Sequence, residues 1–126
     1  EVYFGYLPSE VNNISYDKSN KLSISNKVYL AMDPKQKDSN MDFLLAKMNQ
    51  NLGVLGYKIN LACIKEEGCP DIPLVSCENN ENVLYLKVDL NNRIYKYNGC
   101  LVIEGTDIVE LTKGSDKFIY SISGVL

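Results

Sequence analysis

The chain has 126 residues, which is enough for one domain with one core, and its 45% hydrophobic content is ordinary for a folded protein. The net charge of −3 comes from interleaved acids and bases, without the basic stripe that a nucleic-acid-binding surface needs. The sequence has no His, which excludes Ser–His–Asp and Cys–His nucleophile pairs and imidazole metal ligands, and none of its apolar runs reaches the roughly 18–20 residues that span a bilayer.

The N-terminal region, residues 1–26, is expected to form short strands. It begins with the apolar and aromatic run 2–7, which Pro8 ends. A terminal strand of this kind adds either to its own sheet or to the sheet of a neighbouring subunit. In the second case the partner-binding side chains would be Val2, Tyr3, Phe4 and Tyr6. The alternating segments 14–16 and 22–25 predict a hairpin.

Two features of the same region favour an exported protein. Asn13-Ile14-Ser15 satisfies the N-x-S/T pattern, so Asn13 is a candidate glycosylation site. The sequence opens on Glu1 without an initiator Met. We therefore expect a processed product, with a signal peptide or membrane anchor outside the given sequence.

A strand, a helix and a second strand are expected between residues 28 and 63. The run 28–32 is continuously apolar, which predicts a buried strand, and 57–63 reads as another strand. Between them, apolar residues recur at three- and four-residue steps: Met41, Leu44, Leu45, Met48, Leu52 and Leu55. This order predicts a βαβ unit, whose two strands are parallel.

The ends of the central helix carry capping signals. Ser39 is the predicted N-cap, and Asp42 lies three residues on, in a position like that of a capping box. Gly53 and Gly56 supply the stop. Because these glycines follow the helix, they form no dinucleotide-binding fingerprint, and we expect no cofactor.

The loop after the first buried strand is the strongest candidate metal or ligand site. It holds Asp33, Asp38 and Asp42 near a helix start, where open α/β sheets bind ligands. Carboxylate oxygens there could hold magnesium or calcium. The alternative interpretation is that Asp33 makes a turn, Asp38 is solvated and Asp42 stabilises the helix N-terminus.

Four cysteines lie in the second half of the sequence: Cys63, Cys69, Cys77 and Cys100. They lack the short paired spacings of zinc sites and the C-x-x-C motif of thiol-redox proteins. We therefore favour two disulfides over buried free thiols and over a metal or redox site. Of the three pairings, we expect Cys63–Cys69, which closes a short loop, and Cys77–Cys100, which ties a Pro-containing segment to a hairpin.

The segment 83–104 predicts an antiparallel β-meander. Strands are expected at 83–90, 93–97 and 100–104, joined by the two-residue turns Asn91-Asn92 and Asn98-Gly99. These turns would place one set of residues on the core face: Leu84, Leu86, Val88, Tyr95, Tyr97, Cys100 and Val102. The opposite face would carry Tyr85, Lys87, Asp89, Ile94, Lys96, Leu101 and Ile103.

A terminal helix is expected from Thr106, its predicted cap, to the end of the sequence. Apolar residues fall near one face of this helix: Ile108, Leu111, Phe118, Ile119, Ile122 and Leu126. Gly114-Ser115 is a candidate interruption. Without repeats or linkers, we expect residues 1–126 to form a single domain of the α/β (mixed α+β) class, with one βαβ unit, a β-meander, two main helices and two disulfides.

Three segments together resemble uncharacterised small exported α/β domains of archaea. They are 69–77, from Cys-Pro-Asp to Ser-Cys; 98–105, with Asn-Gly-Cys; and 116–120, ahead of Gly124. The resemblance covers roughly the second half of the sequence. It implies an extracytoplasmic setting and carries no catalytic residue.

Three functions fit these observations. The first is an exported, non-enzymatic cell-surface or accessory domain that binds another protein or assembles with itself. The second is a small-ligand, divalent-metal or carboxylate-dependent enzyme domain that uses the acidic loop 33–42. The third is a thiol-redox protein that uses Cys63 and Cys69. The nine tyrosines could build a carbohydrate- or partner-binding platform, or they could be half-buried packing residues.

Overall fold

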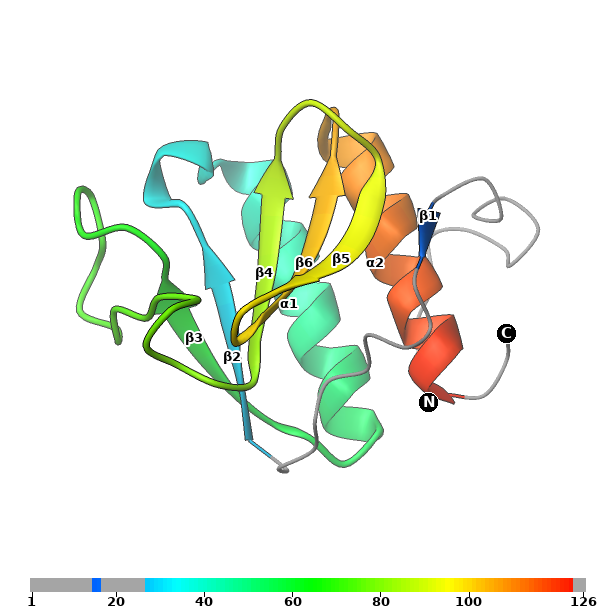
Figure 1. The fold of residues 1–126 in the computed structure, drawn as a ribbon, viewed down its shortest axis with the longest axis horizontal. Helices are drawn as coiled ribbons and strands as arrows, with labels where there is room; N and C mark the ends of the chain where they lie inside the picture. The colour runs from blue at the N-terminus through cyan, green and yellow to red at the C-terminus, as the bar shows by residue number, and fades with distance from the viewer. Residues whose placement is uncertain (1–14, 17–26, 124–126) are drawn as a thin grey trace.

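The computed structural model describes residues 15–16 and 27–123. They form one sheet with two long helices on one of its faces (Figure 1). The elements are β1 (Ser15–Tyr16), β2 (Lys27–Met32), the 3-10 turn η2 (Pro34–Gln36), α1 (Ser39–Val54), β3 (Lys58–Cys63), β4 (Val83–Val88), β5 (Arg93–Tyr97), β6 (Cys100–Gly105) and α2 (Ile108–Ser123). The α/β class with two main helices is confirmed. No helix among the described residues is long and apolar enough to cross a membrane.

The strands lie in the order β1-β5-β6-β4-β2-β3. β3, β2, β4 and β6 are parallel to one another, whereas β5 is antiparallel to β6. The predicted βαβ unit is confirmed, because β2 pairs with β3 in parallel from Lys27↔Lys58 to Met32↔Cys63. The carboxyl ends of the four parallel strands lie at the same end of the sheet, which we call the carboxyl edge (Figure 1).

The predicted meander is wrong in its first turn. β6 lies between β4 and β5, and it pairs with β4 in parallel. The loop with Asn91-Asn92 therefore crosses the end of β6. Within it, Asn91 N–H donates to Glu104 Oε2 at 2.8 Å, and Asn92 Oδ1 accepts from Thr106 N–H at 2.8 Å. The second turn is confirmed, since Tyr97 pairs with Cys100 and Asn98 has a positive φ of 50°.

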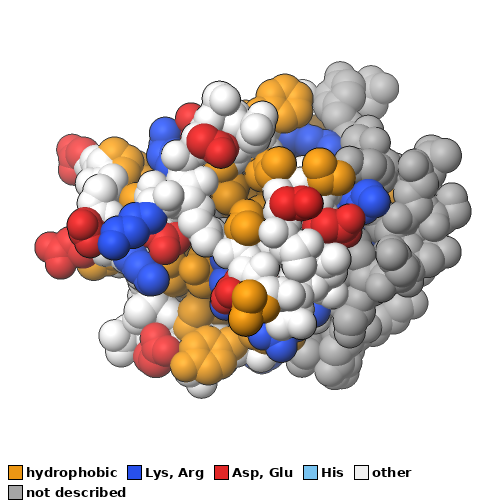
Figure 2. Space-filling model, turned by 90° about the horizontal axis from the view of Figure 1, so that it is seen from above, with side chains coloured by type: hydrophobic (Ala, Val, Ile, Leu, Met, Phe, Trp, Pro, Cys, Tyr) orange, Lys and Arg blue, Asp and Glu red, His pale blue; other side chains and the backbone are white. Residues whose placement is uncertain are grey.

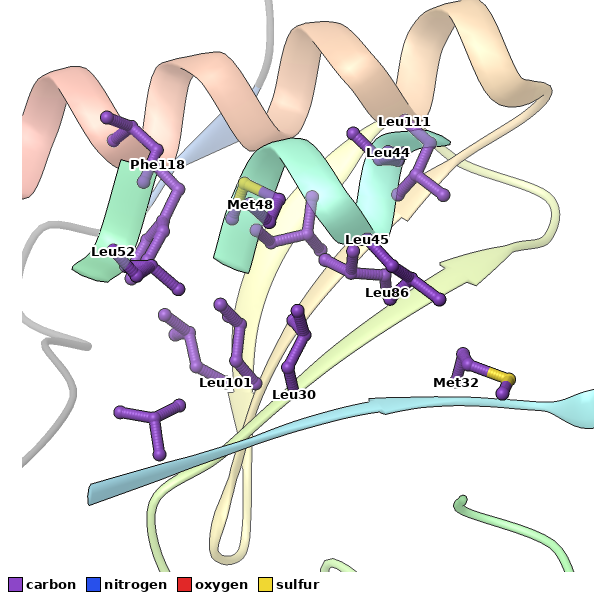
Figure 3. Packing of buried hydrophobic residues seen from close by; sticks show 14 of the residues in the cluster. Leu30, Met32, Leu44, Leu45, Met48, Leu52, Leu86, Leu101, Leu111 and Phe118 are labelled. Atoms are coloured by element: carbon purple, nitrogen blue, oxygen red, sulfur yellow. The ribbon is translucent and has the colours of Figure 1, made fainter. Parts of the chain in front are cut away.

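The main core lies between the helices and the sheet. Leu44, Leu45, Met48 and Leu52 of α1 and Leu111 and Phe118 of α2 point at Leu30, Leu86 and Leu101 of the strands (Figure 3). Full burial of each such side chain stabilises the fold by roughly 1.5–3 kcal/mol. An ion pair also joins the helices, because Lys47 Nζ lies 3.0 Å from Asp116 Oδ1.

Both helices begin with an aspartate beside the residue that the sequence predicted as the cap. Asp38, and not Ser39, is the N-cap of α1, where its carboxylate accepts from Met41 N–H at 2.8 Å. At α2 the corresponding acceptor is Asp107, which bonds Glu110 N–H at 2.8 Å. An ionised carboxylate bonds these amides more strongly than a hydroxyl and also interacts favourably with the helix dipole.

The candidate interruption at Gly114-Ser115 does not break α2, which continues to Ser123. Gly114 faces β6, and a Cβ added there would lie 2.9 Å from Ile103 Cγ2. The missing side chain therefore lets the helix pack closely on the sheet. Ser115 satisfies its buried hydroxyl by donating to the Leu111 carbonyl at 2.9 Å.

The opposite face of the sheet is partly covered by the segment 64–82. Two disulfides fix this segment: Cys63–Cys69, with a Cα–Cα distance of 6.0 Å, and Cys77–Cys100, at 5.0 Å. Both bonds have the pairing expected from the sequence. A second, smaller apolar cluster lies beneath the segment and contains Ala31, Ala62, Val75, Cys77, Val83, Cys100 and Val102.

Candidate functional site

The acidic loop at the carboxyl edge uses its carboxylates for internal contacts. Asp33, 7% exposed, accepts from Lys35 N–H at 3.0 Å as the cap of η2, and its other oxygen lies 3.5 Å from Lys65 Nζ. Seen from this edge, charged side chains of both signs are interspersed with hydrophobic ones (Figure 2). Asp33 is therefore a structural residue of this loop.

The other two carboxylates of the loop also have partners of their own. Asp38 caps α1, and Asp42 pairs with Lys37 Nζ at 3.0 Å. Among residues 15–16 and 27–123, no group of three or more His, Cys, Asp or Glu side chains is placed to hold a metal ion. The structure therefore does not bring Asp33, Asp38 and Asp42 together around one point, because backbone amides and lysines bond the three carboxylates separately.

The remaining predicted site residues divide into two groups. Val2, Tyr3, Phe4, Tyr6 and Asn13 lie outside the described residues. Cys63, Cys69, Cys77 and Cys100 are all joined in disulfides, so none of the four cysteines is a free thiol.

The side of the sheet away from the helices carries a different candidate site. A hollow of about 490 Å³ opens there, which we call the open-face pocket. It is lined by Ile64, Lys65, Ser76, Cys77, Glu78, Tyr85, Lys87, Arg93, Tyr95, Tyr97 and Val102. Its floor belongs to β4, β5 and β6, and its walls belong to the disulfide-anchored segment 64–82. The floor of the site is therefore built on strands, and its wall is a loop segment that the Cys77–Cys100 disulfide ties to that floor.

A row of aromatic and aliphatic residues crosses the floor. Tyr85 of β4 and Tyr95 of β5 both pair with Val102 of β6, which lies between them. Two tyrosines on second-neighbour strands are roughly 9–10 Å apart at the backbone, twice the spacing between strands. Val102 is only 2% exposed, and both tyrosines pack against the small apolar cluster that contains it, so the three side chains form a closed floor.

A row of charged residues lies next to Tyr85, Val102 and Tyr95. Glu104 of β6 pairs with Lys87 of β4 and with Arg93 of β5. Its carboxylate Oε1 accepts from Arg93 Nε at 3.0 Å and lies 3.9 Å from Lys87 Nζ. The Glu104 side chain is only 1% exposed, whereas that of Arg93 is 45% exposed. The buried carboxylate of Glu104 therefore contacts both Lys87 and Arg93, which line the mouth of the pocket.

Neighbouring groups fix the protonation states of the pocket. Burial raises the pKa of Tyr85 to about 12, so its hydroxyl stays neutral at pH 7. Burial works to lower the pKa of Lys87, but hydrogen bonds to Asp89 and Tyr95 outweigh it, and the pKa lies above its ordinary value. The hydrogen bond to Glu104 likewise raises the pKa of Arg93.

The guanidinium of Arg93 is also held against an aromatic ring. Its Cζ lies 4.2 Å from the centroid of the Tyr95 ring, a cation–π arrangement. Together with the bond to Glu104, this contact fixes the guanidinium in one position. An arginine held in this way loses little side-chain entropy when it binds a ligand.

Sequence reasoning did not find this site. It placed Tyr95 and Tyr97 on the core face with Leu84, whereas the structure puts Ile94 of β5 in the core and the tyrosines on the open face. The available signal was the period-two run of Arg93, Tyr95 and Tyr97 on one face of a single strand. Whether this face lies in the core or on the open side depends on the order of the strands, and the tight turn wrongly predicted at Asn91-Asn92 implied a different order.

Comparisons of the sequence and fold with protein-family models, with curated proteins and with solved structures found no match. Function is therefore inferred from the geometry and chemistry of the molecule itself.

Proposed function

We propose that this protein is an exported, non-enzymatic domain that acts at the cell surface or as an accessory subunit by binding another protein. The open-face pocket is the binding surface. The observation that carries the proposal is the Lys87–Glu104–Arg93 row beside Tyr85 and Tyr95 in the lining of this pocket. Arginine and tyrosine are among the residues most enriched where proteins bind one another tightly.

The two disulfides support an exported setting, because such bonds persist mainly in oxidising compartments. They also bear directly on the pocket. Cys77, a wall residue, is bonded to Cys100 of β6, so the wall is tied covalently to the floor. A pocket fixed in this way is formed before its partner arrives, which reduces the entropy cost of binding.

The protonation states favour binding over proton transfer. Tyr85, with a pKa of about 12, stays neutral at pH 7, and Lys87 and Arg93 stay charged. A general acid or base works best with a pKa near the operating pH. Groups with fixed charges and fixed hydroxyls instead provide a constant pattern of donors for recognition.

Site-specific photo-crosslinking in the intact source cells tests this proposal. A benzophenone-bearing amino acid is placed at position 97, on the pocket rim, where Tyr97 is 51% exposed. The matched control carries it at position 109 on α2, where Val109 is 47% exposed. We expect a discrete protein adduct from position 97 and none from position 109. Equal labelling from both positions, or none from position 97, would contradict the proposal.

A further inference from the structure

Strand β3 forms one edge of the sheet, and its outer side is largely open (Figure 1). Among the described residues, only its last residue is paired there. Cys63 N–H donates to the Pro73 carbonyl at 2.9 Å, and the Cys63 carbonyl accepts from Val75 N–H at 2.9 Å. Residues two apart in such a strand point their backbone groups to the same side. The N–H and C=O groups of Ile59 and Leu61 therefore also point away from β2.

An unpaired sheet edge can pair with another chain, and proteins usually protect it with proline, charge or a covering segment. Here the covering segment reaches only the carboxyl end of β3, where Pro73 and Leu74 lie beside Cys63. The first four residues of β3, Lys-Ile-Asn-Leu, hold one charge and no proline. Leu61 is a large apolar side chain that is 41% exposed on this edge. The stretch from Tyr57 to Leu61 is therefore open to a further strand.

A groove of about 290 Å³ adjoins this edge on the helix side, and we call it the edge groove. Leu61 lies in its lining, α1 provides one wall, and the loop with Pro70 and Ile72 provides the other. Its two charged lining residues, Lys37 and Asp42, pair with each other at 3.0 Å. The groove is therefore a mostly apolar recess without net charge, directly beside the open backbone edge.

The limits of the open stretch match a second copy of the same stretch. At its amino end the chain arrives from α1 through Gly56, whose φ of 97° reverses the chain direction. At its carboxyl end the edge is occupied from Cys63 onward by the segment with Pro73. An antiparallel copy of residues 57–61 lies between these two limits when Ile59 faces Ile59. Because the backbone groups of Ile59 point outward, this central pair is a hydrogen-bonded one.

The side chains in this pairing are compatible on both faces of the sheet. On the helix side, Leu61 lies opposite Tyr57 of the second copy, an aliphatic–aromatic pair beside the edge groove. On the other side, Lys58 lies opposite Asn60 of the second copy, and Lys58 is the one charged residue of the stretch. Like charges therefore do not face each other, and every contact occurs twice by symmetry.

We propose that two copies of this protein associate through β3, with residues 57–61 paired antiparallel across a two-fold axis at Ile59. The two sheets then form one continuous sheet, and the second copy covers the edge groove. This association is independent of the proposed function. The floors of the open-face pockets lie on β4, β5 and β6, away from the junction. The dimer therefore presents two open-face pockets on the same side, an arrangement that raises the avidity for a partner with two binding points.

Sedimentation of the intact protein at concentrations up to about 1 mM tests the association, and charge variants at Asn60 test the register. Asn60 is exposed, so its substitution leaves the core intact. Asn60→Glu places a carboxylate opposite Lys58 of the second copy, whereas Asn60→Lys places a like charge there. We expect the first to tighten the dimer and the second to weaken it, each by about two- to tenfold.

The same two substitutions at Asn79 are the matched controls, because Asn79 is exposed in the segment 64–82 and changes the net charge equally. They should leave the dissociation constant of the dimer unchanged. A protein that stays monomeric at every concentration would overturn the proposal. Equal dissociation constants for Asn60→Glu and Asn60→Lys would overturn it as well.

NMR on a mixture of labelled and unlabelled copies measures the pairing directly. We expect a contact between the Hα atoms of Lys58 in one copy and Asn60 in the other, since these residues form a close, non-hydrogen-bonded pair. Amide exchange at Ile59 and Leu61 should slow as the concentration rises. Amides at Ile59 and Leu61 that are already protected in the dilute monomer would show that another segment covers this edge, and they would contradict the proposal. A dimer without the Lys58–Asn60 contact would do the same.

Discussion

Arg93 and Glu104 face each other across the β5–β6 pair, and Arg93 Nε donates to Glu104 Oε1 at 3.0 Å. Glu104 also accepts from Asn91 N–H in the loop that crosses the end of β6. One carboxylate thus joins a strand pair and its crossing loop while it holds a cation at the mouth of the open-face pocket.

Glu104→Gln should destabilise the domain. The substitution keeps the side-chain volume but removes the charge that Arg93 and Lys87 share, and a buried polar group that loses its partners costs about 1–3 kcal/mol. The shift of the urea midpoint at pH 7, with an unchanged slope, measures the loss. The control, Glu78→Gln, alters an exposed rim residue and should stay within about 0.5 kcal/mol. Equal midpoints for the two variants would show that Glu104 has no such role.

Stability should fall between pH 10 and pH 12 because of Tyr85, whose pKa burial raises from 10.0 to about 12 in the folded state. The folded state therefore binds the proton more tightly, so the contribution is complete below pH 10 and is lost as the pH rises toward 12. Tyr85→Phe should flatten the pH dependence of the unfolding free energy in this window.

Tyr57→Phe serves as the control for this measurement. Tyr57 packs at the edge of the main core and lies outside the open-face pocket. Because this variant keeps Tyr85, the pH dependence attributed to Tyr85 should remain in it. Equal changes of slope in Tyr85→Phe and Tyr57→Phe would rule out Tyr85 as the source of the pH dependence.

The two disulfides should differ in their effect on stability. In the chain-entropy model, the bond Cys77–Cys100, with a sequence separation of 23, contributes about 3.5 kcal/mol. Cys63–Cys69, with a separation of 6, contributes about 2.4 kcal/mol. Paired Cys→Ser variants, compared by urea unfolding, should show the larger loss for Cys77 with Cys100. The opposite order would mean that local packing outweighs loop entropy here.

Asp38→Ala should lower stability by about 1 kcal/mol, because it removes the acceptor for Met41 N–H at the start of α1. Ser39→Ala tests the residue that the sequence predicted as the cap. Since Ser39 is the first residue of α1 itself, its substitution should leave the thermal midpoint nearly unchanged. A larger loss of stability with Ser39→Ala than with Asp38→Ala would identify Ser39 as the N-cap of α1.

Local patterns in the sequence were enough to predict the βαβ unit and the second tight turn. The three- and four-residue spacing from Met41 to Leu52 defines α1, and Asn98-Gly99 adopts the hairpin turn that its residue types favour. The disulfide pairing also followed from local placement, since Cys100 starts β6 directly after that turn.

The order of the strands in the sheet could not be predicted from these local patterns, because it depends on contacts between residues far apart in the sequence. Asn91-Asn92 has the composition of a tight turn, yet its polar groups bond Glu104 and Thr106, residues 13 and 14 positions away. The false pairing of β4 with β5 assigned Tyr95 to the wrong face, since a change of register by one residue inverts every side chain of a strand. The candidate site was missed for this reason.

Local patterns in the sequence also do not fix how the carboxylates of the acidic loop are arranged. Asp33 and Asp38 have the residue type of a metal ligand, but the same type caps helical turns, and both residues do so here. Whether neighbouring carboxylates converge or separate depends on backbone direction, which composition does not specify.

The central claim is that the open-face pocket, with Arg93 at its mouth, binds a partner protein. The most direct measurement is the photo-crosslink from position 97 in cells that carry either Arg93→Gln or Lys96→Gln, with both variants confirmed as folded. We predict that the adduct disappears with Arg93→Gln and persists with Lys96→Gln. An adduct of equal yield in both variants would contradict the claim.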